Sequence, residues 1–407
     1  MSTKNIPISE AIAFGDGQGG NALLSLVEHG ILRNLSQSLV YKHLASPLSG
    51  TLVGKGTLRY DFTYFSKVNA YNKSSNNKQI PQISYLLVQL KERKISATEI
   101  EDFDKLNLST QLSSVLGMWI ANITKAIEAD QKIQFFKGSN DFYKSHPENT
   151  RFMPELVMRQ RPTLEQAQFI QNELAAIPYE MSTIFNSRYL NVPTDEFVGV
   201  LYGMCAKNID IYLSALNCSK AAFDTIVNGY AGKNNGQKYV FNGYDIYTDN
   251  ILYTDVAQGD SINGDYAITF KTDGFIGEIH HRDCKLFPTT PVIAKFTVSP
   301  DNFNDLYGFK YENGFGIAYE ELMCGLYDKL FVVAPSEVVV GSTIVLDTNA
   351  KNQGRTITFT SGDTDKATIS GNVLTGVAAG EVVITATYTD EKLGTFTGTK
   401  TITVKAA

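Results

Sequence analysis

The sequence is poor in several features that would point to a function. Its 407 residues include one tryptophan, four cysteines and five histidines. No stretch approaches the roughly 18 consecutive apolar residues that a membrane-spanning helix requires. The net charge of −6 at pH 7 is not concentrated in one block. The sequence therefore favours neither a nucleic-acid-binding patch nor an acidic tail, and direct reading of duplex DNA is not expected.

The cysteines are too few and too scattered to indicate a disulfide framework. Cys205, Cys218, Cys284 and Cys324 are widely spaced and mostly lie beside apolar residues. We expect buried thiols, because nothing in the sequence indicates an oxidising compartment. The first residues carry one lysine and an early acid, and no apolar run follows that could form a signal-peptide core. The expectation is a protein made in the cytoplasm.

Motifs that carry chemistry are also scarce. Neither a Gly-x-Ser-x-Gly elbow nor a Ser-His-Asp spacing is present. Residues 15–20 match a dinucleotide-binding pattern by letter, but no predicted strand precedes them, which favours a glycine-rich arm. Residues 280–284 (His-His-Arg-Asp-Cys) include several metal-ligand types. Neighbouring side chains of a strand point to opposite faces, so this run cannot close a zinc site by itself. We predict no enzyme activity and no catalytic, cofactor-binding or metal-binding residues.

Two or three domains are expected, because a chain of this length exceeds what one core usually organises. Residue usage changes near Val332, and residues 332–407 contain no cysteine, histidine, methionine or tryptophan. Within them, residues 371–386 turn, run along one strand, turn on glycine and run along a second. Residues 332–407 are therefore predicted to be a small β-sandwich, and residues 1–331 form the body.

The clearest sequence pattern in the body predicts a long hairpin. Residues 58–64 alternate apolar and polar side chains, which is typical of a strand with one apolar face, and a second extended run covers residues 83–95. The polar residues 72–79 between them are predicted to be the solvated tip. A hairpin this long does not fold stably by itself, so it must lie on its own domain or on a neighbouring subunit.

A helix of about twenty residues is predicted over residues 108–130 from a three- and four-residue apolar spacing. Its apolar stripe consists of Leu108, Leu112, Val115, Trp119, Ile123 and Ile127. We expect the single tryptophan to pack in the core.

Helices and strands mix in the rest of the body. Thr163 is predicted to cap a helix that Pro178 ends, and Pro193 is predicted to start a helix running through Met204. A turn at residues 241–244 leads into a strand, and residues 310–320 are predicted to form a strand pair about glycines. The fold class of the body is therefore α+β.

The sandwich resembles a known family. Gly371-Asn372-Val373-Leu374-Thr375-Gly376 and the following Ile384-Thr385 strand are similar to the signature of the group 2 bacterial immunoglobulin-like domain, over roughly residues 332–404. The resemblance implies a module that adheres or decorates, carries no chemistry of its own and has a possible host-surface ligand.

The order of elements in the body resembles the HK97-type major capsid proteins of tailed phages. The resemblance implies an N-terminal arm at residues 1–47, an extended loop at 51–94 and a spine helix at 108–130. Peripheral and axial domains then occupy residues 131–331, with the helix at Pro193 and the strand after Gly243 in the axial part and residues 310–320 in the peripheral sheet. The body length and the Ig-like tail are similar to those of major head proteins of small short-tailed phages of the picovirus type.

The resemblance implies self-assembly into pentamers and hexamers of an icosahedral shell that encloses the genome. Its implied partners are further copies of the chain, scaffold and portal proteins, and packaged DNA held by weak non-specific contact. The hairpin-tip residues Lys73 and Lys78 are the candidate inter-subunit contacts. Two alternatives stay open. One is an encapsulin-like nanocompartment shell, and the other is a surface adhesin with an Ig-like module.

Overall fold

The computed structural model describes most of the C-terminal two-thirds of the chain and parts of the N-terminal third. The described residues are 30, 33–34, 37–48, 51–52, 57–64, 82–89, 91–96, 111–157, 162–188, 196–202, 212, 219–229, 238–249, 274–288, 294–298, 306–351 and 353–406. The predicted hairpin tip, the glycine-rich run at residues 15–20 and most of the predicted N-terminal arm lie outside these residues. None of the described helices is long and apolar enough to cross a membrane.

A six-stranded sheet forms the centre of the body, in the order β6-β15-β10-β7-β9-β8. Its strands are β6 (Thr150–Phe152), β7 (Phe197–Tyr202), β8 (Lys238–Phe241), β9 (Tyr244–Asp249), β10 (Phe275–His281) and β15 (Met323–Tyr327). The β6–β15 and β7–β9 pairs are parallel and the others antiparallel. Helices and sheets thus mix along the chain, as the α+β prediction requires.

Strand β7 corrects the helix predicted from Pro193 through Met204. Every residue of β7 is buried, and β10 and β9 pair with its two edges, which makes it a central strand of the sheet. An apolar run this short fits a central strand covered on both faces as well as it fits a helix. The sequence pattern alone does not separate the two states, and pairing with strands distant in the chain decides between them.

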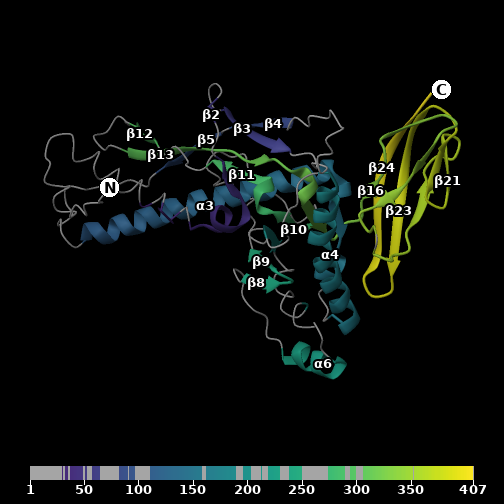
Figure 1. The fold of residues 1–407 in the computed structure, drawn as a ribbon, viewed down its shortest axis with the longest axis horizontal. Coiled ribbons are helices and arrows are strands. Elements are labelled where there is room, and N and C mark those ends of the chain that lie inside the picture. Colours follow the sequence, from purple (N-terminus) through teal and green to yellow (C-terminus); the bar gives the residue numbers. More distant parts are fainter. Residues whose placement is uncertain are drawn as a thin grey trace, which may run out of the picture.

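Helix α3 (Gln111–Ser145) is the longest element and contains most of the predicted spine helix. At 1.5 Å per residue it is roughly 50 Å long, and Figure 1 shows it running lengthwise through the body. It continues fifteen residues past the predicted end at Asp130 and ends at Ser145. The buried positions Ile127, Gln131, Phe135 and Ser139 recur every four residues, so the core-facing stripe does not stop at Asp130.

Helix α4 (Leu164–Arg188) begins where predicted and ends later. The Thr163 hydroxyl accepts the backbone N–H of Gln166, and the Gln166 side chain accepts the backbone N–H of Thr163, which is a capping box. Pro178 lies inside the helix and does not end it. A shorter helix, α6 (Lys220–Gly229), follows β7 in the chain.

The predicted hairpin is confirmed for its described residues. Strands β3 (Thr57–Tyr64) and β4 (Gln82–Gln89) pair antiparallel along their whole length, with β2 (Thr51–Leu52) beside β3. The second predicted run is two strands, because β5 (Lys91–Ser96) leaves the hairpin and pairs with β13 (Leu306–Asn313).

Two small sheets complete the body. β13 also pairs with β12 (Ala294–Val298). β14 (Gly316–Ile317) and β1 (Ser46–Leu48) both pair with β11 (Lys285–Pro288). The predicted strand pair within residues 310–320 is therefore wrong, since β13 and β14 belong to different sheets.

The turn predicted between β8 and β9 is confirmed. Asn242 and Gly243 have φ of 46° and 87°. Positive φ at both central residues is the condition for the two-residue turn that matches strand twist, and Asn-Gly meets it at low cost.

Residues 332–405 form two facing sheets and a separate pair of two-residue strands. The strands are β16 (Val332–Val333), β17 (Glu337–Val339), β18 (Thr343–Val345), β19 (Asp347–Thr348), β20 (Thr358–Ser361), β21 (Ala367–Ser370), β22 (Val373–Gly376), β23 (Gly380–Asp390) and β24 (Gly394–Lys405). The sheets β17-β24-β23-β20 and β18-β22-β21 share a core that includes Leu374, Ile384 and Ile402. The two strands predicted within residues 371–386 are β22 and the first part of β23, with Gly376 and Gly380 on either side of the turn. In Figure 1 the two facing sheets stand beyond α4 at one end of the molecule.

Candidate functional site

The hairpin of β3 and β4 presents one face to solvent. Arg59 and Asp61 of β3 lie opposite Leu87 and Tyr85 of β4. Tyr85 is 58% exposed and Leu87 is 51% exposed. The Arg59 guanidinium lies 4.6 Å from the centre of the Tyr85 ring, and its Nε donates to Asp61 Oδ1 at 2.8 Å. We call these four residues the hairpin face.

The opposite side of the hairpin is turned toward the body. Tyr60 and Leu86 are partly buried. Burial, followed by the charge of Asp283, raises the pKa of the Tyr60 hydroxyl, and burial followed by Tyr60 and Asp283 raises that of Tyr319. The hairpin is thus half covered by its own chain, and the hairpin face remains the uncovered half.

The structure tests part of what the sequence predicted about this hairpin. Lys73 and Lys78 lie outside the described residues, so their role as contacts stays a prediction. Tyr85 and Leu87 were missed. Their signal in the sequence is that residues 82–89 are apolar on both faces, Tyr85 and Leu87 on one and Leu86 and Val88 on the other, which a strand with one solvated face does not need.

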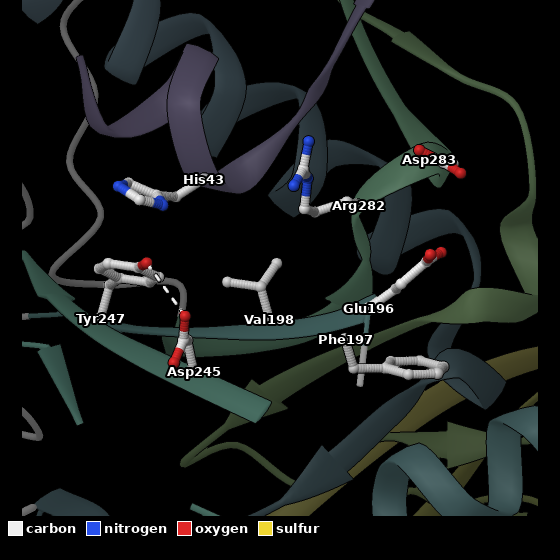
Figure 2. Close-up of a pocket in the computed structure, with 8 residues that line it drawn as sticks. All are labelled: His43, Glu196, Phe197, Val198, Asp245, Tyr247, Arg282 and Asp283. Atoms are coloured by element: carbon white, nitrogen blue, oxygen red, sulfur yellow. Dashed lines mark hydrogen bonds between the residues drawn. The ribbon is translucent and has the colours of Figure 1, made fainter. Parts of the chain in front are cut away.

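A polar pocket of about 260 Å³ lies beside β7 and β9. Figure 2 shows its lining, which consists of His43, Glu196, Phe197, Val198, Asp245, Tyr247, Arg282 and Asp283. The Tyr247 hydroxyl donates to Asp245 at 3.4 Å, and Lys238 pairs with the same carboxylate at 2.7 Å. Burial and the Asp245 charge raise the pKa of Tyr247 to about 12. Asp245 is therefore already engaged by two side chains of its own sheet.

Glu196, His281 and Asp283 are the metal-ligand types that come close together at this pocket, with ligand atoms within 4.8 Å of one another. His281 Nε2 lies 2.9 Å from Glu196 Oε2, while its Nδ1 accepts the Asp283 backbone N–H at 3.2 Å. A neutral ring whose Nδ1 accepts must carry its proton on Nε2. In the neutral ring that nitrogen faces the Glu196 carboxylate with its proton and offers no lone pair.

Arg282 lines the same pocket, whereas His280 and Cys284 make hydrogen bonds inside the body. His280 Nε2 donates to the Leu44 carbonyl at 2.7 Å. The Cys284 thiol donates to the His281 carbonyl at 2.8 Å. Both described cysteines are buried thiols, as predicted, whereas Cys205 and Cys218 lie outside the described residues. Burial raises the pKa of Cys324 to about 12, which keeps it protonated and unreactive.

A buried acid in β10 is also satisfied within the core. Glu278 is fully buried and accepts hydrogen bonds from the hydroxyls of Tyr143 at 3.2 Å and Tyr202 at 3.5 Å. These tyrosines come from α3 and β7. The glutamate therefore ties helix α3 to the central sheet, which is a packing role.

Comparison with known proteins gives matches to solved structures alone. No family model matches the sequence, and no curated protein matches it. The chain is similar to a structure described as the capsid of the cyanophage P-SCSP1u, with 12% identity, a TM-score of 0.41, and coverage of 70% of this chain and 86% of that one. It is similar to the capsid of an empty GTA particle, with 8% identity, a TM-score of 0.40, and coverage of 72% and 89%. It is also similar to a virus-like particle from Pyrococcus furiosus, with 12% identity, a TM-score of 0.37, and coverage of 75% and 97%. TM-scores below 0.5 do not establish a common fold.

Proposed function

We propose that this chain is an HK97-type major capsid protein that assembles into the icosahedral shell enclosing a phage genome. The observation that carries the proposal is the hairpin face. Two large apolar side chains, Tyr85 and Leu87, stand more than half exposed on a hairpin whose other side is already against the body. An exposed apolar surface on an extended element indicates a protein contact.

A neighbouring copy of the chain is the partner that this geometry favours. In a closed shell every subunit makes the same contacts, so the hairpin face of each subunit would be buried against its neighbour. Tyr and Arg, which stack here as Tyr85 and Arg59, are the side chains most often found at the centre of interfaces. On the body side, β4 of the hairpin lies against β14.

Several finer features belong to the same proposal. The sandwich is an Ig-like domain displayed on the outer surface, with a possible host-surface ligand. The shell has the pentamers and hexamers of a small short-tailed phage of the picovirus type, and scaffold, portal and packaged DNA are the other partners. The protein is structural rather than enzymatic, and it resides in the virion capsid after synthesis in the host cytoplasm.

The test is particle formation by a variant that carries Tyr85→Ser and Leu87→Ser. Because both side chains are exposed, monomer melting should change little, while negative-stain images and sedimentation should show free subunits or capsomers instead of closed particles. The matched control carries Val345→Ser and Val383→Ser, two exposed valines of the sandwich. Normal particles from the hairpin variant would contradict the proposal, and so would particles lost equally in the control.

The contents of the particles separate a capsid from a nanocompartment. Particles from infected or lysogenic cells should protect DNA from nuclease. Protein cargo with enzyme activity and no protected DNA would instead favour the encapsulin-like shell. Monomers that bind a cell surface and never form particles would favour an adhesin.

A further inference from the structure

The outer edge of the body's central sheet is covered by the sandwich. Strand β6 stands at the end of the six-stranded sheet, and β15 pairs with its inner side. On its outer side the Phe152 N–H donates to the Asn349 carbonyl at 2.9 Å, and the Phe152 carbonyl accepts from Gln353 Nε2 at 3.0 Å. Both acceptor and donor belong to the connection between β19 and β20. The edge that β6 would otherwise present is therefore hydrogen-bonded by another part of the chain.

Beside this edge, a buried ion pair links the two parts. Arg355 of the sandwich contacts both carboxylate oxygens of Glu155, at 2.7 and 2.9 Å. The two side chains are 5% and 7% exposed. One guanidinium nitrogen, Nη2, donates to both carboxylate oxygens, while Nε donates to Gln353 and Nη1 to Tyr388, so all three nitrogens of Arg355 are held. Removing one partner would leave a buried charge without its counter-ion, which is strongly unfavourable.

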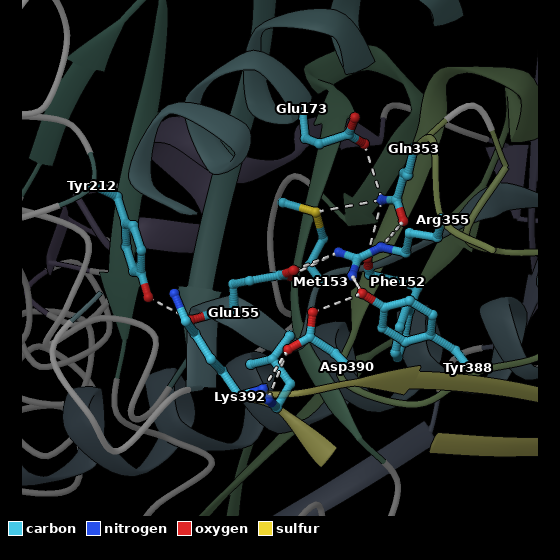
Figure 3. Close-up of polar contacts among 11 residues, drawn as sticks. Phe152, Met153, Glu155, Glu173, Tyr212, Gln353, Arg355, Tyr388, Asp390 and Lys392 are labelled. Atoms are coloured by element: carbon cyan, nitrogen blue, oxygen red, sulfur yellow. Dashed lines mark hydrogen bonds and ion pairs between the residues drawn. The ribbon is translucent and has the colours of Figure 1, made fainter. Parts of the chain in front are cut away.

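Aromatic rings surround the Arg355 guanidinium, as Figure 3 shows in part. The ring centres of Phe169, Tyr388 and Phe152 lie 4.8, 5.0 and 5.1 Å from it. The Tyr388 hydroxyl accepts from Arg355 and donates to Asp390. We call this contact region the joint. Its members are Phe152, Glu155 and Phe169 of the body with Asn349, Gln353, Arg355 and Tyr388 of the sandwich.

An apolar cluster continues the joint. Phe152, Leu330 and Val332 are buried against Ala386 and Tyr388. Phe152 meets Tyr388 and Phe396 edge to face, with ring centres 5.8 and 5.1 Å apart. This cluster is distinct from the sandwich core around Leu374 and combines buried side chains of the body and of the sandwich, which a flexible linker between separate modules does not produce.

We propose that the sandwich is an intramolecular cap of the β6 edge, held in one orientation by Arg355 and Glu155. An uncovered sheet edge is a template for pairing with another chain. When the joint opens, the β6 edge becomes a strand-accepting surface, and its partner is the same edge of a second copy. This role is independent of what the shell encloses and of any ligand of the sandwich. The composition change near Val332 predicts a separable module, whereas the joint predicts that the module stays docked.

Hydrogen exchange in the full-length chain tests the cap. With Arg355→Met, the peptide covering residues 150–156 should exchange about tenfold faster or more, while the peptide covering residues 382–388 should keep its protection. Sedimentation should show new self-association. Adding Glu155→Met, which replaces the whole pair by apolar side chains, should recover part of the protection. The matched control is Lys366→Met, which breaks an exposed ion pair with Asp363 in the same sandwich. Unchanged exchange at residues 150–156 with an intact sandwich would overturn the proposal.

A second measurement does not depend on a variant of the joint. Spin labels at Glu148 and Thr395, both exposed, report the distance between body and sandwich in the otherwise native chain. The docked sandwich should give a single narrow distance distribution. A broad distribution would show a swinging module and would also overturn the proposal.

Discussion

The hydroxyl of Tyr244 donates to the main-chain carbonyl of Leu174 at 2.8 Å. In an uninterrupted helix this carbonyl accepts the N–H of residue 178, which here is proline and has none. A side chain from β9 thus supplies the hydrogen bond that Pro178 removes from α4. Because Tyr244 is itself buried, the bond also satisfies a hydroxyl that water does not reach.

Tyr244→Phe should lower the free energy of unfolding by about 1–3 kcal/mol, because it leaves the Leu174 carbonyl buried without a donor. Pro178→Ala in the same chain should restore much of this loss, since an alanine at this position would donate its backbone N–H to the Leu174 carbonyl. Denaturant unfolding of the two single variants and the double variant measures the coupling. Tyr85→Phe, at an exposed tyrosine, is the control. Additive effects of the two changes would show that the Tyr244 hydroxyl does not substitute for the missing N–H.

Buried carboxyl groups outside the joint should contribute stability on acidification. Burial raises the pKa of the carboxyl groups of Glu173 and Asp328. A carboxyl group whose pKa is raised in the folded state stabilises the fold once it is protonated, and this contribution is lost as pH rises through the folded pKa. The Lys366 side chain lowers the pKa of Asp363, so destabilisation from that group begins only at more acidic pH.

Burial lowers the pKa of His43 and His281, so these two rings oppose the gain from the carboxyl groups as pH falls. Glu173→Gln should therefore lower the melting temperature at acidic pH relative to the native chain, because the amide does not titrate and still accepts from Gln353. Glu165→Gln, at an exposed position of the same helix α4, should leave the pH dependence of the melting temperature unchanged. Equal pH dependence in the Glu173 variant and the native chain would contradict the assignment.

The hairpin-tip lysines should act between subunits. Lys73 and Lys78 are flanked by Ser, Asn and Gln and have no apolar neighbour in the sequence. Charges across an interface fix specificity and register more than affinity. Lys73→Glu combined with Lys78→Glu should keep the monomer's circular dichroism and melting while closed particles decrease in sedimentation. Normal particles would mean that the tip makes no charge-dependent contact.

The single tryptophan should contribute to the core of the spine. Trp119 lies within α3, on the apolar stripe that the sequence predicts. Trp119→Ala should cost about 3–5 kcal/mol by leaving a cavity, which thermal melting of soluble protein would detect. An unchanged melting temperature would show that residue 119 faces solvent.

Strands, turns and helix caps that depend on residues close together in the sequence were predictable. The hairpin strands alternate with a period of two, and the turn at Asn242-Gly243 uses the residues that accept positive φ. The capping box at Thr163 and the alternating strands of the sandwich likewise depend on near neighbours in the chain. In each case the residues that make the structure lie within a few positions of one another, so the signal is complete in the sequence.

The hairpin face was predictable only in part. The sequence located the hairpin and named its tip lysines, but it did not show which apolar side chains of β4 stay uncovered. Tyr85 and Leu86 are adjacent and both largely apolar, yet the first is exposed and the second partly buried. The body packs against one side of the hairpin, and that choice is made by elements far away in the chain.

By itself the sequence determined the α+β class, the hairpin, the position of the long helix and the strand pattern of the sandwich. Only the tertiary structure decided that Phe197–Tyr202 is a strand, that α4 passes through Pro178, and that Arg355 meets Glu155. Each of these depends on partners far apart in the sequence. Hydrogen bonds from β9 and β10 hold residues 197–202 as a strand, and the Tyr244 hydroxyl replaces the N–H that Pro178 lacks. Arg355 and Glu155 meet only when the folded chain buries both side chains together. Local propensity sets which structures a segment can adopt, and the free energy of long-range pairing and burial selects one of them.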